Sequence, residues 1–128
     1  MKATELVSMW GSLDNTRLTS KQVSFRLPVH VAAKIAALCD LYPTKTRTQI
    51  VGDLLSSALG DVEKALPAFK GERWGSATDD NGGPLFMTVG PMADFRHRTN
   101  VHYVAFEKEL GMDEPAPFYP GDLIWEEG

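Results

Sequence analysis

The sequence at residues 21–28 reads Lys-Gln-Val-Ser-Phe-Arg-Leu-Pro, and polar and apolar side chains alternate along it. The apolar positions are Val23, Phe25 and Leu27, and the polar positions are Gln22, Ser24 and Arg26. A period of two predicts a short strand with one buried face. Pro28 ends this strand and suits a helix start, where the missing N–H is not needed. Since a strand of this length is not stable alone, we expect it to pair with the same strand of a second chain.

Residues 29–41 are predicted to form a first helix. Val31, Ile35 and Leu38 recur at three- and four-residue spacing, which is typical of one apolar helix face. Tyr42-Pro43 ends the pattern, because the residue before a proline is disfavoured in helical geometry.

A second helix is predicted to begin at Thr46. Thr46 and Gln49 have the spacing of a capping box, in which each side chain binds the backbone N–H of the other residue. The apolar face that follows includes Ile50, Leu54 and Leu55. This helix either ends at Gly60 or continues to residues 65–67.

Strand, helix, turn and helix within residues 21–66 resemble the ribbon-helix-helix family of Arc, MetJ and CopG-type repressors. Gln22, Ser24 and Arg26 align with the family's base-reading strand positions, although Arc has asparagine in the middle. Thr46-Arg47-Thr48-Gln49-Ile50 is similar to the family's second-helix start, while the turn at residues 42–45 lacks the usual glycine. The resemblance implies a mainly α fold with a short β-ribbon, in which two chains form an intertwined homodimer.

The resemblance also implies that the protein is a sequence-specific transcriptional regulator, and more narrowly a repressor. Its two-stranded ribbon would enter the major groove of double-stranded DNA. Gln22, Ser24 and Arg26 would then contact bases. The expected phosphate contacts are Lys21, Lys45, Thr46, Arg47 and Thr48. The expected dimer core consists of Val23, Phe25, Leu27, Ile35, Leu38, Ile50, Leu54 and Leu55. A dimer of dimers on DNA is a further expectation.

Charge is distributed unevenly, although the net charge of the 128 residues is -4. Residues 16–50 carry six basic side chains and one acid, a balance of +5. Residues 107–128 carry seven acids and one lysine, a balance of -6. This asymmetry indicates a nucleic-acid face near one end and an acidic tail at the other, although both could be ordinary solvated surfaces.

Outside residues 21–66 the sequence predicts less. We expect an N-terminal arm at residues 1–20, with a short helix over 3–10, and an irregular, partly β extension at residues 67–128. Glycine and aspartate favour a loop over residues 67–84, whereas 85–89 and 101–106 are candidate strands, giving a possible β-hairpin. Residues 112–128 read as an irregular acidic tail with aromatic side chains.

Other chemistry is weakly indicated. His97 and His102 are five residues apart, and Cys39 lies on the apolar stripe of the first helix, so no metal site is predicted. No phosphate loop, nucleophile elbow or zinc-hydrolase motif is present, so we expect neither an enzyme nor a cofactor. The lack of an apolar leader and the single cysteine favour a cytoplasmic protein.

Two other functions remain open at this point. One is an antitoxin, whose residues 112–128 would bind a toxin. The other is a dimerisation scaffold that does not bind DNA, which the sequence pI of about 5.3 favours.

Overall fold

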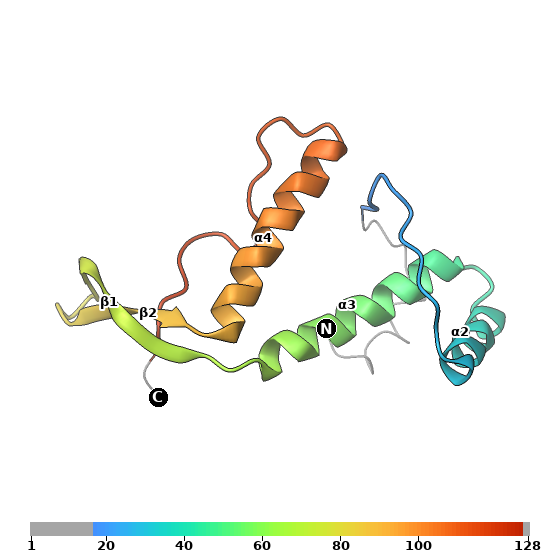
Figure 1. The fold of residues 1–128 in the computed structure, drawn as a ribbon, viewed down its shortest axis with the longest axis horizontal. Coiled ribbons are helices and arrows are strands. Elements are labelled where there is room, and N and C mark those ends of the chain that lie inside the picture. The colour runs from blue at the N-terminus through green and yellow to red at the C-terminus, as the bar shows by residue number, and fades with distance from the viewer. Residues whose placement is uncertain (1–16, 127–128) are drawn as a thin grey trace. The chain divides into compact units, whose positions relative to one another are not determined.

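The computed structural model of the chain describes residues 17–126 and contains three helices and a two-stranded sheet in that part. The chain divides into two compact units, Met1–Lys64 and Ala65–Gly128. Figure 1 shows α2 and α3 in the first unit and β1, β2 and α4 in the second. The short helix expected over residues 3–10 lies outside the described residues.

The described part of the N-terminal unit contains α2 (Val29–Leu41) and α3 (Arg47–Ala65). The predicted first helix is confirmed at both ends. The carbonyl of Pro28 accepts hydrogen bonds from the amides of Val31 and Ala32 at 3.1 and 3.0 Å. Pro28 thus caps α2 from outside the helix, with an extended backbone.

One fully buried apolar side chain, Ile50 of α3, marks the contact between the two helices. Four partly buried residues pack against it, namely Leu38, Cys39, Tyr42 and Leu54. The apolar stripes predicted for the two helices therefore do meet. They form a small core, because two packed helices have little surface to bury.

The capping box at the start of α3 is confirmed. The amide of Thr46 donates to Gln49 Oε1 at 2.8 Å, and the amide of Gln49 donates to Thr46 Oγ1 at 3.1 Å. α3 then runs through Gly60 to Ala65, which decides between the two predicted ends.

The expected ribbon-helix-helix fold class is wrong for the structure described. Residues 21–27 form no strand, and no backbone hydrogen bond joins residues 22–27 to another segment within residues 17–126. The two strands lie instead in the C-terminal unit, which also contains a third helix, so the order of a strand followed by two helices is not shown. Alternation of side chains sets the two faces of a strand, but a strand exists only when its backbone groups have a partner.

The C-terminal unit begins with an antiparallel hairpin of β1 (Phe69–Thr78) and β2 (Pro84–Val89). Asp79 closes the turn, since its Oδ1 accepts from the amides of Asn81 and Gly83 at 2.9 and 2.8 Å. The predicted strand at 85–89 is confirmed, whereas the loop expected over residues 67–84 is wrong for most of its length. Glycine-rich β1 has weak strand propensity, so its pairing with β2 decides its conformation.

The third helix, α4 (Pro91–Glu109), follows Gly90, whose positive φ of 105° turns the chain out of β2. The strand expected over residues 101–106 is therefore wrong, because these residues lie inside α4. Their β-branched and aromatic side chains favour a strand locally, but Tyr103 and Glu107 point inward at helical spacing.

The segment after α4 is irregular, as predicted, yet it packs on its own unit. Asn100 of α4 exchanges two hydrogen bonds with the backbone of Tyr119, at 3.0 and 2.8 Å. Further along, the amide of Thr88 donates to the Leu123 carbonyl at 2.9 Å, and an antiparallel bridge joins Met87 and Ile124. Among the helices described, none is long and apolar enough to cross a membrane.

Candidate nucleic-acid interface

The segment before α2 exposes its side chains on both sides. All residues from 17 to 30 are exposed, and these include the predicted base-reading side chains Gln22, Ser24 and Arg26. Polar groups on an accessible segment can approach an external ligand without unfolding of the helices. The segment thus offers an amide, a hydroxyl and a guanidinium, which are the groups that hydrogen-bond base edges.

The apolar side chains of the same segment are exposed as well. Phe25 is 76% exposed, and Val23 and Leu27 are also exposed, so this chain alone does not place them in a core. Of the other residues expected in a dimer core, Ile50 is buried, Ile35, Leu38 and Leu54 are half-buried, and Leu55 is exposed. The set is thus split between the core of one chain and its surface, and burial by a second chain stays a prediction.

The N-terminus of α3 carries the predicted phosphate contacts. The capping box occupies the amides of Thr46 and Gln49, which leaves the amides of Arg47 and Thr48 in the first turn, where helix geometry provides no carbonyl partner. The side chains of Arg47 and Thr48 are exposed, and Lys45, two residues before Arg47, is half-buried. Such an end binds anions, because its amides and its dipole both favour negative charge.

The electrostatics of this region favour a polyanion. Asp40 is the one acid among residues 17–50, against six lysine and arginine side chains. The acids of α3 come later in the helix, beginning with Asp53, which is largely buried. Basic charge is therefore concentrated in residues 17–47, on and beside the exposed segment.

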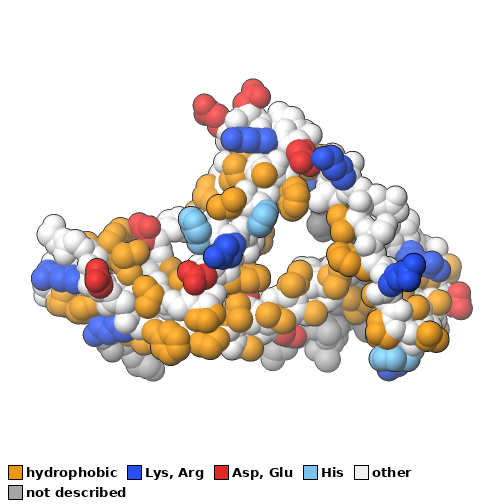
Figure 2. Space-filling model, viewed as in Figure 1, with side chains coloured by type: hydrophobic (Ala, Val, Ile, Leu, Met, Phe, Trp, Pro, Cys, Tyr) orange, Lys and Arg blue, Asp and Glu red, His pale blue; other side chains and the backbone are white. Residues whose placement is uncertain are grey.

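An uncovered apolar surface was only partly recognised from the sequence. Leu55, Leu59 and Val62 form an exposed row along α3, and Figure 2 shows hydrophobic side chains exposed along this helix. At the start of α2, Val29 is 87% exposed. The exposure of Val29 could have been predicted from helical spacing, because Val29 lies two residues before Val31 and hence on the opposite face of α2.

The described residues show no group of three or more histidine, cysteine, aspartate and glutamate side chains that could hold a metal ion. Cys39 is half-buried against Ile50, which gives it a packing role.

Comparison of the chain with models of protein families, with curated proteins and with solved structures found no match.

Proposed function

We propose that the N-terminal unit binds double-stranded DNA and that the protein is a sequence-specific transcriptional regulator, acting as a repressor. One observation supports the proposal: an exposed segment with amide, hydroxyl and guanidinium side chains, and a helix N-terminus with exposed Arg47 and Thr48, belong to the same unit, in which residues 17–47 are basic. The proposal rests on these exposed groups and not on a strand at residues 21–27.

Base recognition is assigned to the segment before α2. Arg26 can donate two hydrogen bonds to O6 and N7 of guanine, and Gln22 can pair with N6 and N7 of adenine. Ser24 can donate or accept and so prefers no single base. Exposure of all three side chains supports this assignment.

Backbone contacts are assigned to the start of α3. A DNA phosphate placed there would accept hydrogen bonds from the amides of Arg47 and Thr48, with charge added by Arg47 and Lys45. These contacts would fix the orientation of the unit on DNA without reading its sequence. Lys21 adds a phosphate contact next to the base-reading side chains.

The proposal includes a homodimer formed through the apolar surface of the N-terminal unit. Leu55, Leu59 and Val62 repeat at four- and three-residue spacing, so the row on one α3 matches the row on a second copy. Phe25 and Val29 of the same unit are further exposed apolar side chains. We assign the exposed row on α3 to the dimer contact, because an exposed apolar patch marks an interaction site in a globular protein.

The test is selection of binding sites from a random pool of DNA duplexes, followed by titration of the selected duplex at several salt concentrations. We expect enrichment of a defined sequence and an affinity that falls steeply with salt, because phosphate contacts release counterions. The proposal is contradicted if no sequence is enriched and the intact protein has no affinity for DNA even at low salt.

A further inference from the structure

The C-terminal unit contains a pocket that the proposed DNA contacts do not use. It lies where the first turns of α4 meet β2 and the segment that follows α4, and its volume is about 320 Å³. This volume lies near the lower end of the roughly 300–1,000 Å³ typical of small-molecule sites. The pocket therefore suits a small metabolite.

One wall of the pocket is held at both ends. Residues 120–122 form this wall, and just before them Tyr119 is tied to Asn100 of α4 through two hydrogen bonds. Just after them, the carbonyl of Leu123 accepts from the amide of Thr88 on β2. A loop fixed at two points holds its side chains in place before a ligand arrives, which lowers the entropic cost of binding.

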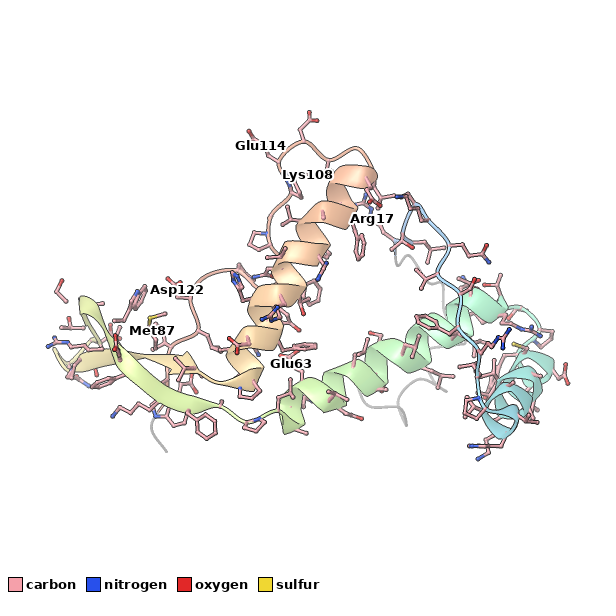
Figure 3. All side chains as sticks on the ribbon, viewed as in Figure 1. Arg17, Glu63, Met87, Lys108, Glu114 and Asp122 are labelled. Atoms are coloured by element: carbon pink, nitrogen blue, oxygen red, sulfur yellow. The ribbon has the colours of Figure 1, made fainter. Side chains whose placement is uncertain are left out.

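The pocket combines both signs of charge with apolar surface. The Arg96 guanidinium lies 4.8 Å from the centre of the Tyr119 ring, and both residues line the pocket. Asp94 from α4 and Asp122 from the loop add carboxylates, and Leu123 adds apolar surface. Figure 3 labels Asp122 on the loop and Met87 on β2, two of the residues that line the pocket.

We propose that this pocket binds a free amino acid. Its carboxylate would pair with Arg96, and its ammonium group would pair with Asp122 and Asp94. A ligand with only a negative charge would meet two carboxylates, and a ligand with only a positive charge would meet the guanidinium. A small zwitterion presents a carboxylate and an ammonium group together to a lining of both signs, and charge-assisted hydrogen bonds are the strong ones.

The proposal is independent of DNA binding and is tested on the full chain without DNA. Each of the twenty standard amino acids is added at about 5 mM, or near saturation where an amino acid is less soluble, to exceed a Kd of about 1 mM, while amide signals are followed by ¹H–¹⁵N NMR. We expect at least one amino acid to shift the amides of residues 96–100 and 119–123 in a saturable way. If none of the twenty does so, the proposal is overturned.

Analogues of the amino acid that binds then test the two charges. The acid that lacks the amino group and the amine that lacks the carboxylate should each bind at least about tenfold more weakly, because each loses one charge-assisted contact. Equal affinity of either analogue would overturn the zwitterion assignment.

Variants of the two aspartates test which side chains bind the ammonium group of the amino acid. Asp122→Asn and Asp94→Asn change exposed side chains, so the fold should be kept, and at least one should raise the Kd about tenfold or more. Asp113→Asn is the matched control on an exposed acid outside the pocket. If both pocket variants bind the amino acid as the control does, the assignment of the ammonium contact is wrong.

Discussion

Two non-helical segments of the chain differ in how their backbone is bound to the rest of their own unit. Residues 22–27, before α2, have no backbone hydrogen bond to another segment within the described chain. Residues 119–125, after α4, are tied through Asn100, Thr88 and the bridge between Met87 and Ile124.

Residues 119–125 are bound to their own unit through hydrogen bonds, whereas residues 22–27 leave their backbone groups accessible to a second molecule. Backbone groups that lack a protein partner must bind water or another molecule. The side chains of residues 22–27 are exposed on both sides, so a second molecule can be bound without breaking contacts within the unit. We therefore propose macromolecular recognition for the N-terminal unit and small-molecule binding for the C-terminal unit.

The largest effect on stability is expected from Ile50→Ala, because Ile50 is the fully buried apolar side chain between α2 and α3. The change should lower the free energy of unfolding by about 2–5 kcal/mol. Leu41→Ala, at a side chain that is 70% exposed, is the control and should cost less than about 1 kcal/mol. Equal losses in the two variants, measured by denaturant unfolding, would show that this core does not stabilise the unit.

Asn100→Ala tests whether the segment after α4 is held as described. The variant removes both hydrogen bonds to Tyr119 and should destabilise this attachment by about 1–3 kcal/mol. Hydrogen exchange of the Tyr119 amide should then be faster, while Asn81→Ala, at an exposed turn, should leave it unchanged. If the Tyr119 amide in Asn100→Ala exchanged as slowly as in the unmodified protein, Asn100 would not hold the segment after α4, and the contrast between the two segments would be wrong.

Thr46→Ala tests the start of α3. Loss of the capping box should cost about 1 kcal/mol and lower the Tm by several degrees. Thr46→Ser keeps the hydroxyl and should retain most of the stability, and Thr44→Ala, in the turn before it, is the neutral control. A Tm for Thr46→Ala equal to that of the control would mean that the cap contributes nothing.

Phe25→Ser should have the smallest effect on the stability of the isolated chain, within about 0.5 kcal/mol, because this side chain is exposed. If a second copy covers it, the same change should weaken self-association, measured by sedimentation over a range of protein concentrations. Phe118→Ser is a control at an exposed phenylalanine of the C-terminal unit. A dimer unaffected by Phe25→Ser would exclude Phe25 from the interface.

Local signals in the sequence predict the N-terminal helices well. The stripe of Val31, Ile35 and Leu38 predicts α2, and the spacing of Thr46 and Gln49 predicts the capping box, because both depend on residues within one or two turns. The prediction of a strand at residues 21–27 was wrong, because a strand needs a pairing partner and the sequence pattern does not supply one.

The C-terminal unit was harder to predict for the same reason. β1 exists through pairing with β2, and α4 contains a run of residues that favours a strand locally. The pocket is formed by Arg96 and Asn100 together with Tyr119, which lies about twenty residues further along the chain. No local pattern links these positions, so its side chains could not be grouped from the sequence.

The most direct test of DNA recognition by the N-terminal unit is the affinity of Arg26→Ala for the selected duplex and for a scrambled duplex of the same length. We predict a loss of about 1–3 kcal/mol for each guanine contact removed on the selected duplex, and a much smaller loss on the scrambled one. Arg98→Ala, at an exposed arginine of α4, should bind both duplexes as the unmodified protein does. Binding of the selected duplex by Arg26→Ala with unchanged affinity would contradict the assignment of base reading to the segment before α2.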